Sequence, residues 1–203
     1  MKHMRLFSMQ STSTVSRPLA VLRSGSTGND VRLLQQRLNI IRTIPGLTGL
    51  AALTVDGNFG PRTAAGVRRF QTLFNLTVDG IVGPQTWSVL FRESLPGAFS
   101  ETANFRPFRV EFAPGATSGI VATSSVRGDF EVYVVNAKAG QIVRLNITSP
   151  EDNAVIDSIV TANNQELIPG IDDILRFPLT SDHLIVVGKT RGNATYQLEI
   201  LIR

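Results

Sequence analysis

A ten-residue phrase that occurs twice constrains the fold of this chain more than any other feature. The sequence reads TVDGNFGPRT at 54–63 and TVDGIVGPQT at 77–86, and seven of the ten positions are identical. In each copy an Asp-Gly dipeptide favours a tight turn, because glycine adopts positive φ without steric cost. A Gly-Pro pair follows, and proline suits the first helical position, where an N–H would have no partner. Each copy therefore predicts a turn that starts a helix.

Apolar residues with helical spacing follow both copies and also precede the first. In chain order the three stripes are Val31, Leu34, Leu38 and Ile41, then Ala64, Val67, Phe70 and Phe74, and finally Trp87, Leu90 and Phe91. The first helix is expected to be capped within 28–30, where Asn or Asp can accept hydrogen bonds from free N–H groups. Three helices with short connections predict a compact three-helix bundle.

The hydrophobic period changes from helical to alternating after residues 95–97, which read Leu-Pro-Gly. Apolar residues occupy every second position at 196–202, and a continuous apolar run at 184–187 predicts a strand buried on both faces. Strands with turn signals and no convincing helix predict an all-β sandwich, aligned or jelly-roll. We therefore expect two domains after a flexible arm at 1–23: an all-α domain at 24–95 and an all-β sandwich at 96–203.

Composition excludes several function classes. The chain has 203 residues, 42% of them hydrophobic, and no apolar run approaches the roughly 20 residues that span a bilayer. It has no cysteine, which excludes disulfides, thiolate metal sites and a cysteine nucleophile. The N-terminus lacks the apolar core of a secretory signal. We expect a cell-envelope, periplasmic or extracellular location, reached after removal of a signal or within a particle.

The two halves of the chain differ in charge. Residues 1–95 hold eleven Lys/Arg against four Asp/Glu, whereas residues 96–203 hold nine against twelve, so the net charges are +7 and −3. The basic half suits an anionic partner such as a cell-wall polymer, although arginines that merely solvate the helices give the same count. The arginines are scattered and not interleaved with aromatic residues, so we do not expect nucleic-acid binding.

Residues 24–91 resemble the peptidoglycan-binding domain family, which is often appended to cell-wall amidases and muramidases. The matching stretches are GSTGNDVRLLQQRLN, TVDGNFGPRTAAGVRRFQ and TVDGIVGPQTWSVL. The resemblance implies a three-helix fold that binds peptidoglycan. The connection at 42–53 is longer than is usual in the family and is expected to alter one rim of a groove.

Residues 99–203 resemble two β-sandwich families less specifically. The stretches YVVNAKAGQIVRLNITSP and NATYQLEI are similar to the bacterial pre-peptidase C-terminal domain and to g-type lysozyme inhibitors. This resemblance implies an accessory binding or spacing module.

The residues that peptidoglycan hydrolases need are missing from the sequence. Zinc hydrolases use three protein ligands, yet the histidines are only His3 and His183, and we expect the latter in a surface turn. No G-x-S-x-G nucleophile motif is present. Asp56 and Asp79 are a candidate glycosidase pair, but turn stabilisation explains their duplication. We therefore predict no catalysis, no metal and no cofactor.

Binding, unlike catalysis, needs only a shaped surface. Turn N–H groups, arginines and an aromatic face can hold sugar rings and stem peptides. Gln71 stands at the family's F-Q position and offers a paired donor and acceptor, whereas Trp87 either stacks on a sugar or belongs to the core. The predicted ligand-binding residues are Asp56, Gly57, Asn58, Phe59, Arg62, Arg69, Gln71, Asp79, Gly80 and Trp87.

The leading hypothesis is a non-catalytic protein that binds peptidoglycan and anchors itself, or an attached assembly, to the bacterial cell wall. One alternative is a structural component of a phage tail or a phage-like contractile injection machine, with the β-sandwich docked on the particle and contacting its proteins. Another alternative is a lysozyme inhibitor.

Overall fold

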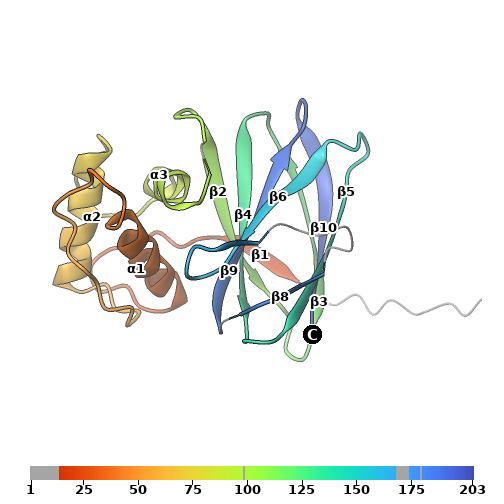
Figure 1. Cartoon of the computed structure of the whole chain (residues 1–203), viewed down its shortest axis with the longest axis horizontal. Helices are drawn as coiled ribbons and strands as arrows, with labels where there is room; N and C mark the ends of the chain where they lie inside the picture. Colours follow the sequence, from red (N-terminus) through yellow and green to blue (C-terminus); the bar gives the residue numbers. More distant parts are fainter. Residues whose placement is uncertain (1–13, 98, 168–173, 179) are drawn as a thin grey trace, which may run out of the picture.

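The computed structural model describes residues 14–97, 99–167, 174–178 and 180–203, and within them three helices and two sheets (Figure 1). The helices are α1 Asn29–Ile41, α2 Pro61–Leu73 and α3 Pro84–Ser94. The strands are β1 Val15–Pro18, β2 Asn104–Glu111, β3 Ser118–Ser125, β4 Asp129–Ala137, β5 Ile142–Thr148, β6 Ala154–Val160, β7 Glu166–Leu167, β8 Ile174–Arg176, β9 Ser181–Lys189 and β10 Ala194–Ile202. The predicted helical N-terminal part and β-rich C-terminal part are both confirmed.

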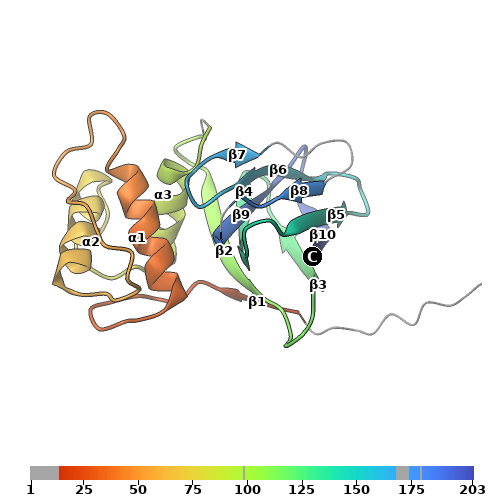
Figure 2. The same cartoon turned by 60° about the horizontal axis from the view of Figure 1, so that its bottom comes forward.

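Six strands form one sheet in the order β1-β2-β4-β9-β6-β7, and four form the other in the order β3-β10-β5-β8. Strands β2 and β4 pair in parallel, and the other pairs are antiparallel. We call residues 19–95 the head and residues 99–203 the β region. The head lies against the six-stranded sheet on the side away from the four-stranded sheet (Figure 2).

Strands β4 and β9 are buried on both faces because the head covers one face of their sheet. In β4, Val132 and Val134 belong to the same apolar core as the helices, whereas Tyr133 and Val135 belong to the core shared with the four-stranded sheet. All four side chains are fully buried. The apolar run at 184–187 lies in β9 and is buried in the same two-sided way, as the sequence predicts.

The Gly-Pro pairs start helices, as predicted. Helices α2 and α3 begin at Pro61 and Pro84, each after a glycine with extended backbone. The predicted side-chain cap of α1 is wrong, because no side chain caps this helix. The carboxylate of Asp30 instead accepts hydrogen bonds from the N–H of Ala20 at 3.0 Å and from Nε of Arg109 at 2.6 Å.

The part of the predicted flexible arm that the structure describes differs from the prediction. Residues 1–13 lie outside the described residues, but Val15–Pro18 form strand β1 at the edge of the six-stranded sheet, opposite β2. Leu22 then pairs with Val82 in the head. A four-residue strand that ends in proline is too short for its alternation to be visible in the sequence.

The head and the β region meet at a buried ionic cluster. Arg109 of β2 binds Asp30 of the head and also donates to both carboxylate oxygens of Asp182 in β9, at 3.1 and 2.8 Å. These three side chains are at most 6% exposed, and the less buried Arg17 binds the second oxygen of Asp30 at 2.9 Å. Removing one partner of a buried ion pair leaves the other charge buried without compensation, which lowers stability by about 3–5 kcal/mol. An apolar core and an ionic cluster therefore cross the predicted domain boundary, whose position stays a prediction.

His183 differs from the sequence prediction, whereas His3 lies outside the described residues. His183 is not a surface turn residue: it is fully buried in β9, with its ring stacked on Phe177 at a centroid distance of 3.9 Å. The Asp-His pair before the apolar run belongs to the strand itself and not to the turn that precedes it.

Candidate functional site

The first repeated turn is held by one buried glutamine from α1. Nε2 of Gln35 donates to Oδ1 of Asp56 at 2.8 Å and to the carbonyl of Asn58 at 3.0 Å. Oε1 of Gln35 accepts the N–H of Gly57 at 2.9 Å. One amide group therefore fixes three successive residues of the turn.

The second repeated turn is held in the same way by Gln71 of α2. Its Nε2 donates to Oδ1 of Asp79 at 2.8 Å and to the carbonyl of Ile81 at 2.9 Å, and its Oε1 accepts the N–H of Gly80 at 2.9 Å. The duplicated sequence thus builds a duplicated hydrogen-bond cluster. The helix before each turn supplies the glutamine that fixes it.

An arginine lies over the glycine of each turn. Gly57 and Gly80 have φ of 77° and 76°, as the Asp-Gly dipeptides predict. A Cβ added at Gly57 would lie 3.0 Å from Cγ of Arg32, and one added at Gly80 would lie 3.0 Å from Cζ of Arg68. Both arginines are exposed, and each precedes its turn-binding glutamine by three residues. The turns therefore present two equivalent exposed cations.

The two aspartates act as turn residues. Oδ1 of each accepts the N–H two residues later, at 2.8 Å in both turns. Hydrogen bonds from the Gln35 side chain and then from the N–H of Asn58 hold the pKa of Asp56 below its usual value. The N–H of Ile81 and then the Gln71 side chain lower the pKa of Asp79. A proton donor in glycoside hydrolysis needs a raised pKa, so these shifts oppose that role.

One short segment before α1 hydrogen-bonds to both turns. Leu22 exchanges backbone hydrogen bonds with Val82 of the second turn, at 3.1 and 2.8 Å. Gly25 and Ser26 bond in the same way to Phe59 of the first turn, at 3.0 and 2.9 Å. Because Leu22 and Ser26 are four residues apart, the points at which this segment meets the two turns lie within about 14 Å of each other. The same short segment therefore contacts both turns.

Of the ten predicted site residues, four are exposed, five are buried and Arg69 is half-buried. Asp56, Asn58, Arg62 and Asp79 are exposed on or next to the two turns. Phe59, Gln71 and Trp87 are at most 2% exposed. The side-chain amide of Gln71 is hydrogen-bonded to the second turn, and Nε1 of Trp87 donates to the carbonyl of Ala20 at 2.9 Å. Gln71 therefore positions the second turn, whereas Trp87 lines a cavity of about 310 Å³ between the head and β2.

Arg69 has a structural contact that the sequence prediction did not foresee. Its Nε and Nη2 both donate to the carbonyl of Thr48, at 3.0 and 2.8 Å, which ties α2 to the long connection at 42–53. Sequence reasoning missed Arg32, Gln35 and Arg68. The pattern Arg-x-x-Gln, read as RLLQ at 32–35 and RRFQ at 68–71, precedes both turns and is the signal that identifies them.

Neither a metal cluster nor a membrane-spanning helix occurs in the part of the chain that the structure describes. No three His, Asp or Glu residues there are grouped to hold a metal ion. The helices described are too short and too polar to cross a bilayer.

Comparison with known proteins supports the sequence resemblance of the head. Residues 27–90 match the family model described as "Putative peptidoglycan binding domain", which confirms the resemblance found for residues 24–91. The zinc D-Ala-D-Ala carboxypeptidase of Streptomyces albus G is 46% identical over 71 residues, which are 35% of this chain and 26% of that protein. The chain thus spans about a quarter of the length of this curated relative.

Solved structures similar to this chain include examples of two kinds. The first kind includes the Burkholderia AP3 phage endolysin, which has 39% identity, covers 35% of this chain and 24% of that chain, and has a TM-score of 0.30. It also includes a peptidoglycan-binding protein from Clostridioides difficile, with 34% identity, coverage of 39% of this chain and 46% of that chain, and a TM-score of 0.33. The second is PliG of Aeromonas hydrophila, a periplasmic inhibitor of g-type lysozyme, with 22% identity over 49% of this chain and 97% of that chain, and a TM-score of 0.43.

Proposed function

We propose that this chain is a non-catalytic protein that binds peptidoglycan through the head and so anchors itself, or an assembly attached to its β region, to the bacterial cell wall. The observation that carries the proposal is the match of residues 27–90 to a peptidoglycan-binding family, over the segment that forms the doubled turn. In this proposal the β region is a sandwich to which the assembly attaches, and the protein acts in the cell envelope.

The geometry of the two turns supports binding. Gln35 and Gln71 fix the turn backbones before any ligand arrives, so little conformational freedom is lost on association. Arg32, Arg62 and Arg68 are exposed next to those turns, where guanidinium groups can pair with the carboxylates of stem peptides. The exposed ligand-binding set proposed here is therefore these three arginines with Asp56, Asn58 and Asp79.

The test is co-sedimentation of the full chain with purified murein sacculi at physiological salt. The full chain is needed because the head shares its apolar core with β4 and β9. We expect Arg32→Ala/Arg68→Ala to bind at least about fivefold more weakly, which corresponds to about 1 kcal/mol. The matched control is Arg144→Ala/Arg203→Ala, which removes two exposed arginines of the β region and should change binding less than twofold.

Two outcomes would reject the proposal. One is a wild-type chain that stays in the supernatant at every sacculus concentration tested. The other is release of muropeptides by the purified chain, since the proposed protein binds the wall without cutting it. Equal weakening by both double variants would show that general charge, and not the turn surface, governs binding.

A further inference from the structure

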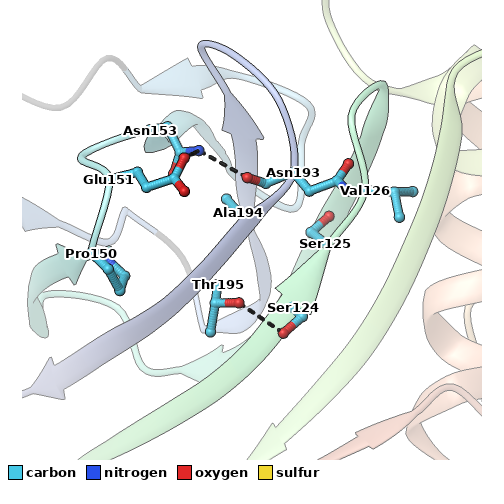
Figure 3. Close-up of a pocket in the computed structure, with 9 residues that line it drawn as sticks. All are labelled: Ser124, Ser125, Val126, Pro150, Glu151, Asn153, Asn193, Ala194 and Thr195. Carbon is cyan, nitrogen blue, oxygen red and sulfur yellow. Dashed lines mark hydrogen bonds between the residues drawn. The ribbon is translucent and has the colours of Figure 1, made fainter.

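The β region has a pocket of its own at the end of the four-stranded sheet (Figure 3). Its volume is about 380 Å³, and its walls come from the end of β3, the β5–β6 connection and the start of β10. A second cavity of about 400 Å³ shares Pro150 and Thr195 with it and continues along β10 to Gln197. We call the two together the loop pocket.

Two asparagines tie the three walls of the loop pocket to one another. Asn153 is 1% exposed, and its Nδ2 donates to the carbonyl of Asn193 at 2.9 Å and to that of Arg191 at 3.2 Å. Oδ1 of Asn193 accepts the N–H of Arg127, just after β3, at 2.9 Å. Loops that are hydrogen-bonded to one another keep their conformation without a ligand, which lowers the entropic cost of binding one.

The floor of the loop pocket rests on a buried ion pair. Ser125 lines the pocket, is 3% exposed, and donates its hydroxyl to the carboxylate of Glu131. Glu131 is fully buried and pairs with Nζ of Lys189 at 3.0 Å. The hydroxyl of Tyr196 also donates to this carboxylate, at 3.3 Å. Because the Glu131 carboxylate has several bonding partners, this polar network holds Ser125 in place at the floor.

The side chains around the loop pocket favour a neutral, hydroxyl-rich ligand. Ser124 and Thr195 present hydroxyl groups that bond to each other at 3.0 Å across β3 and β10, and both are exposed. Asn193 and Gln197 add amides, which donate and accept like the groups of a sugar. The charged side chain among the lining residues is Glu151, and Nη2 of Arg191 donates to its carbonyl at 2.7 Å, so charges of both signs lie here and neither favours an ionic ligand.

We propose that the loop pocket binds a neutral saccharide that carries hydroxyl and acetamido groups. Val126, which is 52% exposed, and Pro150 line opposite sides of the pocket (Figure 3), and each offers apolar contact that suits the C–H face of a sugar ring. Two adjoining cavities suit a short chain of rings better than one ring. The site is separate from the turns of the head and does not rest on the function proposed for them.

The test is a titration of the ¹⁵N-labelled full chain with the β-1,4-linked tetramer of N-acetylglucosamine, followed by NMR and calorimetry. We expect saturable shifts at 124–127, 149–153 and 193–197. Thr195→Val removes a lining hydroxyl and should weaken binding about fivefold, whereas Glu151→Gln removes the lining charge and should change the affinity for this neutral tetramer less than twofold. The controls Thr117→Val and Glu166→Gln change exposed residues outside the pocket and should bind like the wild type.

The anionic tetramer of galacturonic acid tests the charge argument, and we expect no saturable shifts from it in these segments. The proposal is overturned if the acetylated tetramer at millimolar concentration leaves the loop-pocket signals unmoved, or if the anionic tetramer binds there equally well. Shifts confined to 54–86 would also overturn it, while supporting a ligand site on the head. Failure of sacculus binding leaves this result unaffected, so the two proposals are tested separately.

Discussion

Replacing Gln71 by alanine tests whether the repeated turns are held by buried glutamines. The substitution removes an acceptor from the N–H of Gly80 and donors from the carboxylate of Asp79 and the carbonyl of Ile81. Gly80 is buried, so water cannot replace the lost acceptor, whereas Asp79 and Ile81 are exposed and can be hydrated. The three losses are therefore unequal.

The magnitude follows from these differences in burial. A buried N–H left without a partner costs about 1–3 kcal/mol, and each bond replaced by water costs about 0.5–1.5 kcal/mol. These costs sum to about 2–6 kcal/mol, and we expect a loss in the free energy of unfolding of about 3 kcal/mol, in the lower half of that range, because Asp79 and Ile81 are exposed. For a chain of 203 residues this corresponds to a fall in Tm of about 6–12 °C.

Urea denaturation of the full chain, followed by circular dichroism, measures this loss. The control is Gln36→Ala, because Gln36 is half-buried and makes one bond of 3.3 Å, to the hydroxyl of Ser181. We expect this control to lose less than about 1 kcal/mol. Equal stabilities of the two variants would refute the argument that the amide of Gln71 holds the turn.

Two further predictions concern charge and backbone conformation. Burial would raise the pKa of Asp30, but bonds from Arg17, the N–H of Ala20 and Arg109 outweigh it and hold the pKa below its usual value. The carboxylate therefore stabilises the folded chain at pH values above its unfolded pKa, and this stabilisation is lost as pH falls through its folded pKa. Asp30→Asn should flatten the decline in the free energy of unfolding below about pH 4, as measured by urea titrations. An unchanged decline would contradict this. Gly57→Val and Gly80→Val should each cost about 1–3 kcal/mol in urea unfolding because both glycines have positive φ. Gly57 should be the costlier, since its Cβ would lie 3.2 Å from a backbone carbonyl, and the reverse order would count against this reasoning.

The local part of the fold could be predicted from the sequence because its causes are local. Turn and helix starts depend on neighbouring residues, so the doubled decapeptide places α2 and α3 correctly from Pro61 and Pro84. The buried strand at 184–187 was equally visible, since no polar residue interrupts it. For the same reason the resemblance of the head rests on short motifs that remain contiguous in the chain.

Contacts between distant segments could not be predicted in the same way. Arg109 alternates with apolar neighbours and therefore reads as a solvent-facing strand residue, yet the head covers it and supplies Asp30 as its partner. Phe59, Gln71 and Trp87 have residue types that suit a ligand surface, and only packing shows that they are interior. The loop pocket joins three segments whose polar residues read separately as ordinary turns.

The packing of the head on the β region argues that the two do not separate in the native state. Detaching the head would expose five fully buried side chains of the six-stranded sheet, namely Val132, Val134, Val160, Leu184 and Val186. At about 1.5–3 kcal/mol for each side chain, this costs about 7–15 kcal/mol, which is comparable to the total stability of a domain. Separation would also break the bond between Arg109 and Asp30. A wall-bound head would therefore fix the orientation of the β region and, with it, the direction in which the loop pocket faces.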